Sequence, residues 1–94
     1  MDYNKLIEQT CDEIKQLLIQ KNTAYGNSVF KPVSKFGISI SPVDAIIARM
    51  SDKEARIANK GFNDLTEDTH KDLIGYHILL HIVLSLGYLN NQEE

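Results

Sequence analysis

The sequence predicts an all-α fold: one domain of three main helices, at about 3–21, 42–60 and 67–87, around a long central loop. Apolar residues recur at spacings of three, four and seven in these segments, and start and stop signals bracket the second one. The 94 residues suit one domain, and 43% hydrophobic with 24% charged residues is an ordinary globular composition. We expect the tail, 89–94, to be frayed.

The first helix, at about 3–21, is amphipathic. Its apolar stripe needs a partner surface and consists of Leu6, Ile7, Ile14, Leu17 and Leu18. Cys11 lies on the same stretch, and as the single cysteine of the chain it cannot form an intrachain disulfide. We expect a buried, unreactive thiol there.

The second helix has well-defined ends. Ser41 can accept hydrogen bonds as the N-cap, Pro42 suits the first helical position, and Asp44 complements the positive end of the helix dipole. Gly61 is the expected stop. These local signals predict a helix over 42–60.

The third helix is expected to begin after Thr66 as N-cap, with Glu67 and Asp68 in its first turn. From Leu73 onward it is apolar on nearly every side. A helix of that kind needs neighbours on several faces, so we expect it at the centre of the domain and in the interface of a symmetric homo-oligomer.

The segment 22–40 lacks strong helix signals, and a connection of this length in a small domain is commonly functional. Gly26 most simply provides a helix stop or a positive φ angle, in preference to a close approach to a ligand. A short strand is also predicted, because apolar residues alternate with small ones at Phe36, Ile38 and Ile40.

Charge is distributed unevenly along the chain. The net charge is −3, yet 21–40 holds Lys21, Lys31 and Lys35 and no acidic residue. This pattern suits a small anionic ligand and argues against binding to duplex nucleic acid, which needs clustered cations. No apolar run reaches about 18 residues and no signal peptide is evident, so we expect a cytoplasmic protein without a membrane span.

The basic segment also suggests how a ligand would be held. Lys21, Lys31 and Lys35 can donate to phosphate, and Tyr25 offers an aromatic face to a base. The alternative is a solvated loop in which Tyr25 packs against the helices.

Three aspartates are the candidate metal ligands. Asp68 and Asp72 are four residues apart and share a helical face, and Asp52 on the preceding helix could oppose them around Mg²⁺. In the alternative, Asp68 complements the helix dipole while Asp52 or Asp72 forms salt bridges with Arg49 or Arg56.

Three histidines, His70, His77 and His81, project towards one side of the third helix. Such a row can bind zinc with a carboxylate. The alternative is a buried or interfacial histidine that makes one hydrogen bond, which the apolar surroundings favour.

Three short motifs carry a family resemblance: residues 21–26 read KNTAYG, 49–57 read RMSDKEARI and 67–76 read EDTHKDLIGY. In this order and spacing they resemble the nucleotide modification associated domain 1 family, common in phage genomes. The resemblance covers roughly 11–84 and implies a link to nucleotides without defining a reaction.

A fainter likeness is to the all-α NTP pyrophosphohydrolases of the MazG and dimeric dUTPase type, which hold magnesium between acidic helices. This chain departs from their pattern, because Lys53 and Arg56 stand near expected glutamates and Thr69 precedes Asp72 where another is expected. Neighbouring cations oppose Mg²⁺ and favour phosphate directly.

The sequence thus favours a phage-type protein that binds or sequesters a nucleotide or a cyclic nucleotide in the host cytoplasm, which would counter host defence. The residues expected to contact the ligand are Lys21, Tyr25, Gly26, Lys31, Lys35, Arg49, Lys53 and Arg56. The first alternative is a Mg²⁺-dependent nucleotide pyrophosphohydrolase with Asp52, Asp68 and Asp72 as catalytic residues and metal ligands. The second is a helical protein-interaction module.

Overall fold

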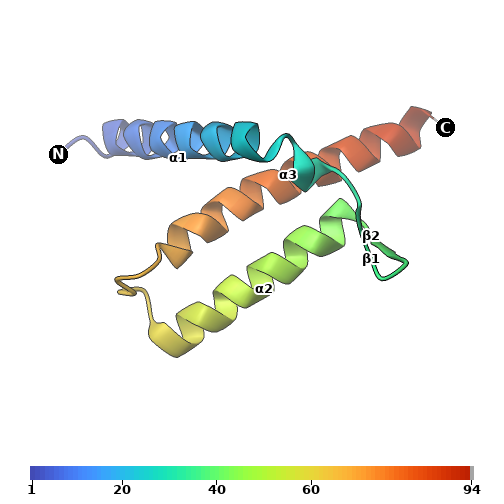
Figure 1. Ribbon diagram of the computed structural model, residues 1–94. Coiled ribbons are helices and arrows are strands. Elements are labelled where there is room, and N and C mark those ends of the chain that lie inside the picture. Colours follow the sequence, from blue (N-terminus) through green and yellow to red (C-terminus); the bar gives the residue numbers. More distant parts are fainter. Residues whose placement is uncertain (94) are drawn as a thin grey trace.

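The computed structural model describes the backbone of residues 1–93 and the side chains of residues 1–87. Its elements follow one another in the order α1 (Tyr3–Tyr25), the 3-10 helix η1 (Ser28–Phe30), β1 (Val33–Lys35), β2 (Ile38–Ile40), α2 (Pro42–Lys60) and α3 (Thr69–Glu93), as Figure 1 shows. Three helices dominate, so the predicted all-α class is broadly confirmed. A small two-stranded sheet is added to it.

Helix α1 begins at a cap and ends one turn later than predicted. The Asp2 carboxylate accepts a hydrogen bond from the Lys5 backbone N–H at 3.1 Å. At the other end Gly26 has φ 61°, a left-handed conformation that favours glycine, and the Asn27 N–H donates to the Asn22 carbonyl. Gly26 therefore stops the helix, and Tyr25 lies on its last turn instead of in a loop.

The predicted short strand is one half of a hairpin. β1 and β2 are antiparallel, with Val33 opposite Ile40 and Lys35 opposite Ile38. Phe36 and Gly37 form the two-residue turn, with φ angles of 54° and 76°. Both central residues of a type I′ hairpin turn have positive φ, and Asn-Gly is its preferred sequence.

Helix α2 has the predicted bounds. The Ser41 hydroxyl accepts a hydrogen bond from the Asp44 N–H at 3.1 Å, and Pro42 occupies the first turn. Gly61 ends the helix with φ 76°, and its N–H donates to the Ile57 carbonyl at 2.7 Å.

Helix α3 begins later than predicted, and Thr66 is not its cap. Asp68 takes that position, because its carboxylate accepts from the Lys71 N–H at 3.2 Å and its carbonyl from the Asp72 N–H at 3.0 Å. Thr66 is instead bound to the Asp64 carboxylate. The helix continues to Glu93, past the expected end near 87 and through most of the tail expected to be frayed; Glu94 lies outside the described residues.

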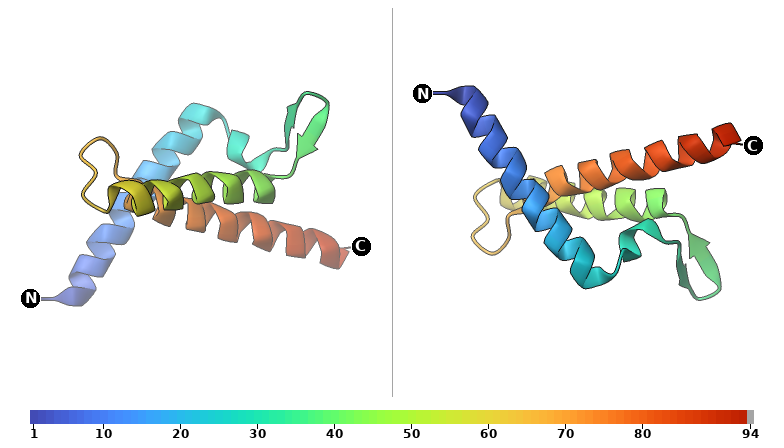
Figure 2. Two further views of the ribbon diagram at one scale, coloured as in Figure 1. Left: turned by 90° about the horizontal axis from the view of Figure 1, so that it is seen from below. Right: turned by 90° about the horizontal axis from the view of Figure 1, so that it is seen from above.

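The antiparallel pair α2 and α3 lies side by side, and α1 crosses it (Figures 1 and 2). Where α1 crosses α3, a β-carbon at the buried Gly75 would lie 3.0 Å from Leu18 Cδ2, so glycine permits a close approach. The buried hydrophobic side chains are few among the described residues: Ile14, Ile46 and Met50, of which Ile46 alone is fully buried.

The described chain leaves much apolar surface in contact with solvent. Its accessible surface is 7562 Å², against about 5500 Å² for a folded monomer of this mass. The Cα radius of gyration is 15.6 Å, against about 12 Å for a compact domain of this length. Residues 1–13, which include the first half of α1, are all exposed.

Of two predictions about burial, the one for Cys11 is wrong and the one for helix α3 is confirmed only in part. Cys11 was expected to be buried but is exposed, as is every residue from 1 to 13, because the N-terminal part of α1 projects from the other helices (Figure 2). Helix α3 packs against α1 and α2, as its apolar sequence predicts, yet its outer positions Ile78, Ile82, Leu84 and Leu86 stay 38–53% exposed. No helix among the described residues is long and apolar enough to cross a membrane.

Candidate functional site

A cavity of about 410 Å³ lies where α1, η1 and the start of β1 face α2 and α3. Leu17, Leu18, Ile46 and Leu79 give it an apolar floor. Its basic lining consists of Lys21, Lys31, Arg49, Lys53 and Lys71, and it holds two tyrosines, Tyr25 and Tyr76. Asp72 is the one acidic side chain in this lining. We call this site the central cavity.

Five of the eight predicted ligand contacts meet in the central cavity: Lys21, Tyr25, Lys31, Arg49 and Lys53. Of the other three, Gly26 has a structural role at the end of α1 and Lys35 lies on β1. Arg56 belongs to a polar network beside the cavity. The structure therefore brings side chains from the first helix, the central segment and the second helix to one cavity.

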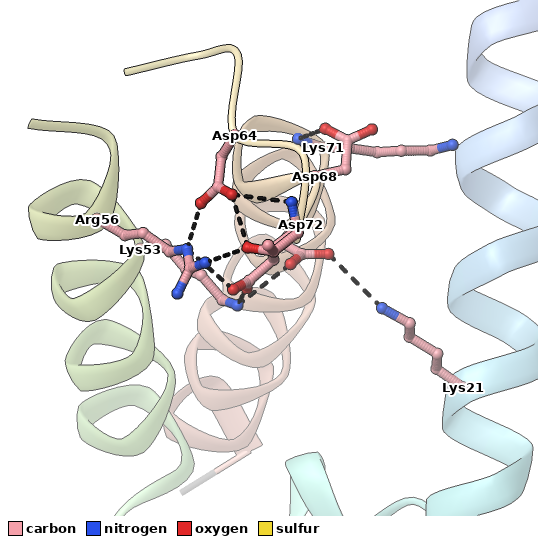
Figure 3. A network of polar contacts seen from close by, with 9 residues as sticks. Lys21, Lys53, Arg56, Asp64, Asp68, Lys71 and Asp72 are labelled. Carbon is pink, nitrogen blue, oxygen red and sulfur yellow. Dashed lines mark hydrogen bonds and ion pairs between the residues drawn. The ribbon is translucent and has the colours of Figure 1, made fainter. Parts of the chain in front are cut away.

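Asp72 joins all three helices electrostatically (Figure 3). Its carboxylate lies 3.2 Å from Lys53 Nζ on α2 and 3.6 Å from Lys21 Nζ on α1. Lys53 also pairs with Glu67 in the segment before α3. Asp72 thus partly neutralises two of the lysines predicted to contact phosphate.

Arg56 organises the connection between α2 and α3. Its Nε donates to the Asp64 carboxylate at 2.7 Å, and Nη2 donates to the Thr66 hydroxyl at 2.7 Å. The Glu67 carboxylate lies 3.2 Å from Nε. The Thr66 hydroxyl and backbone N–H, followed by Arg56, hold the pKa of Asp64 well below its usual range.

Lys71 is fixed by an acidic residue of α1. Its ammonium group donates a hydrogen bond to Glu13, a contact between residues far apart in sequence. This bond raises the pKa of Lys71, with smaller contributions from Asp68 and Asp72. The pair ties the start of α3 to α1 at the edge of the cavity.

Two cations of the central cavity have no acidic partner among the described side chains: Lys31 and Arg49. Lys31 makes only a long contact of 3.5 Å to the Gly26 carbonyl. Asn22, also in the lining, has an Oδ1 that is shielded from solvent and accepts no hydrogen bond from the described residues. These groups are available to a ligand.

The three candidate metal ligands have separate roles in this chain. Asp68 caps α3, Asp72 pairs with lysines, and Asp52 is exposed on α2. Within the described part of the chain, no three histidine, cysteine or acidic side chains are grouped as a metal site. The salt-bridge alternative describes Asp72 correctly, although its partners are lysines rather than the predicted arginines.

The three histidines of α3 are exposed rather than buried. His70 stacks edge-on against Phe62, with ring centroids 5.7 Å apart. His77 and His81 lie further along the same helix and outside the central cavity.

Sequence reasoning missed Tyr76, Lys71 and Asn22 as parts of this lining. Tyr76 follows Asp72 by four residues, so helical spacing alone places both on one face. Lys71 could not be found in that way, because its position depends on Glu13, which is 58 residues away.

Comparison with known proteins gives no further identification: no family model, no curated protein and no solved structure matches this chain. The family resemblance therefore stays a prediction from the three short motifs.

Proposed function

We propose that this protein binds a nucleotide or a small nucleotide-derived anion in the central cavity. The observation that carries this proposal is the convergence of five basic side chains from three helices and the intervening segment on one cavity that has a single acidic lining residue. Lys31 and Arg49 line this cavity and have no acidic partner among the described side chains. A role in ion pairs that stabilise the fold therefore does not explain why these two cations are there.

The charge balance indicates an anionic ligand. Asp72, Glu67 and Glu13 offset part of the charge of Lys21, Lys53 and Lys71. Lys31 and Arg49 add two positive charges without such partners. Guanidinium and ammonium groups are strong donors to phosphate oxygens, so these two residues are the expected primary phosphate contacts.

The remaining lining suits a nucleobase. Tyr25 and Tyr76 can offer aromatic faces beside the apolar floor, and every base has a face that can stack. The unpaired Oδ1 of Asn22 can accept a hydrogen bond from a base amine. The volume of about 410 Å³ falls within the usual range for small-ligand sites, about 300–1000 Å³.

Binding without turnover suits this site best, because Asp52, Asp68 and Asp72 are not grouped around one point. In a phage-type setting, the protein would withdraw a nucleotide or a cyclic nucleotide signal in the host cytoplasm. Sequestration of that kind needs affinity and no catalytic group.

The same proposal includes a homo-oligomer. The accessible surface of 7562 Å² exceeds that of a typical folded monomer by about 2000 Å², and large exposed apolar residues lie on α1, α3 and the hairpin, among other places. An obligate interface commonly buries surface on this scale. Association of copies would complete the small hydrophobic core.

The test is calorimetric titration with mononucleotides and cyclic oligonucleotides, with and without Mg²⁺, followed by chromatography of the recovered ligand. The Arg49→Gln variant removes a cavity cation, and Lys35→Gln removes an exposed cation outside the cavity as the matched control. We expect intact ligand, and a loss of about tenfold or more in affinity for Arg49→Gln alone. Equal losses in both variants, or no binding of any nucleotide, would reject the proposal; metal-dependent breakdown of the ligand would establish the pyrophosphohydrolase instead.

A further inference from the structure

The tip of the hairpin presents an aromatic side chain in an unfavourable backbone conformation. Phe36 is 100% exposed and has φ 54°. Bulky side chains rarely adopt a positive φ, and this turn type prefers asparagine at that position. Neither burial within the described chain nor turn geometry explains phenylalanine there.

The strands below the tip extend its apolar character. Ile38 and Ile40 share one face of β2 and are 65% and 37% exposed. The opposite face of the hairpin carries the paired Ser34 and Ser39. The face with Ile38 and Ile40 also carries their strand partners Val33 and Lys35, so the hairpin is an arm with a largely apolar face, one lysine near its tip and an aromatic end. Both views in Figure 2 show it extending away from α1 and α3.

A second apolar feature lies elsewhere on the molecule. A groove of about 380 Å³ runs between α1 and α3, and its polar lining is limited to Lys15, Asn22 and Thr23. Its apolar walls include Cys11, Ile19, Phe30, Ile78, Leu79 and Ile82. Ile19 is 59% exposed and Ile78 is 41% exposed. We call this feature the apolar groove.

We infer that the Phe36 hairpin of one copy docks into the apolar groove of a second copy. This inference rests on the self-association proposed above and adds its contact. The arm points away from the groove of its own chain, so the two surfaces can meet only between chains. Because each copy has one arm and one groove, the contact can be made reciprocally in a two-fold dimer or head to tail in a larger ring.

The exposed area agrees with two contacts for each chain. A standard protein interface buries about 800 Å² on each partner, and the excess surface is about 2000 Å². In a ring, every copy gives its arm to one neighbour and its groove to the other. In a two-fold dimer, the two copies exchange arms, so each copy again uses both its arm and its groove.

The first test compares Phe36→Asn with Phe62→Asn by analytical ultracentrifugation. Phe36→Asn creates the preferred Asn-Gly turn, so the hairpin should be retained while its aromatic end is lost. Phe62 is 73% exposed in the loop between α2 and α3 and serves as the matched aromatic control. Loss of one buried aromatic contact should weaken association about tenfold to hundredfold in Phe36→Asn alone.

The second test uses Cys11, which lies in the groove. Mild oxidation of Phe36→Cys should form a disulfide between position 36 of one copy and Cys11 of another. A head-to-tail ring would give a ladder of dimers, trimers and larger products, and a reciprocal dimer would give a doubly linked dimer. Phe36→Cys with Cys11→Ser should lose this disulfide and its products. Peptide mass spectrometry identifies the linked pair.

The outcomes separate this inference from the proposed function. Unchanged association in Phe36→Asn, or a cross-link limited to Cys11–Cys11 dimers, would overturn the docking contact alone. A monomeric wild-type protein would overturn both the docking contact and the homo-oligomer. Phe36 is not among the lining residues of the central cavity, so nucleotide titration tests the proposed ligand site without mutating it, although Leu18 and Asn22 line both the cavity and the groove.

Discussion

Replacing Asp72 by asparagine should weaken the fold and tighten ligand binding at the same time. The carboxylate holds Lys53 at 3.2 Å and Lys21 at 3.6 Å and is itself 18% exposed. The asparagine side chain keeps the volume and removes the charge. In Asp72→Asn, both lysines lose a competitor for the anionic ligand.

The two effects can be estimated from the geometry. Lys21 is 53% exposed, so its pair should contribute no more than about 1 kcal/mol, and the more shielded Lys53 pair about 1 kcal/mol. A total loss of about 1–2 kcal/mol lowers the melting temperature by roughly 4–16 °C in a domain of this size. A ligand charge about 8 Å from the carboxylate is repelled by about 2 kcal/mol at an effective dielectric constant of about 20. Dissolved salt screens this repulsion, so we expect the affinity of Asp72→Asn for the nucleotide to rise about fivefold to thirtyfold.

Thermal unfolding without ligand and calorimetric titration below the melting temperature measure the two effects separately. The control is Asp52→Asn, which removes an exposed carboxylate from α2 and should change neither quantity appreciably. Weaker nucleotide binding in Asp72→Asn would refute the view that this carboxylate competes with the ligand. Loss of a measurable hydrolytic turnover in the same variant would show that Asp72 is catalytic.

Three further predictions concern the fold. Ile46→Ala removes a side chain that is 1% exposed, and chemical denaturation should show a loss of about 2–5 kcal/mol. The lowered pKa of Asp64 means that its contribution is present above the unfolded value, 3.8, and is lost as pH falls through the lower folded value; melting curves of Asp64→Asn should therefore depend less on pH below about 4. Gly75→Val places branched carbons against Leu18 at the helix crossing, so it should be destabilised by about 1–3 kcal/mol in denaturant titration and bind nucleotide more weakly, whereas Leu18→Ala should partly restore both properties.

A helix end can be predicted from the sequence when the interactions that fix it lie within one helical turn, and it cannot when they come from another helix. Ser41, Pro42 and Gly61 act within one turn, and the bounds of α2 agree with prediction. The start of α3 was predicted wrongly, because Arg56 on α2 binds Asp64 and Thr66 and leaves Asp68 as the cap. No pattern within three or four residues encodes that contact.

The candidate site follows the same rule. Composition placed Lys21 and Lys31 in a basic segment and helical spacing placed Arg49 beside Lys53, and the fold brings all four to one cavity. Asp52, Asp68 and Asp72 are not grouped among the described residues, because Asp68 caps α3 and Asp72 pairs with lysines of two other helices, and these contacts cannot be predicted from helical spacing alone. Cys11 was placed wrongly because an amphipathic stripe predicts that a helix packs against a partner without showing how much of the helix is covered.

Amide exchange in the projecting first half of α1 shows whether another surface covers that part of the helix. Residues 3–13 are exposed on every side, and an isolated helix of that length is marginal in water. In an uncovered chain, their amide hydrogens should exchange with solvent deuterium nearly as fast as those of a free peptide, while those around Ile46 and Met50 exchange slowly. Slow exchange at the start of α1 would therefore reveal, without any label or mutation, that another surface has come to lie on it.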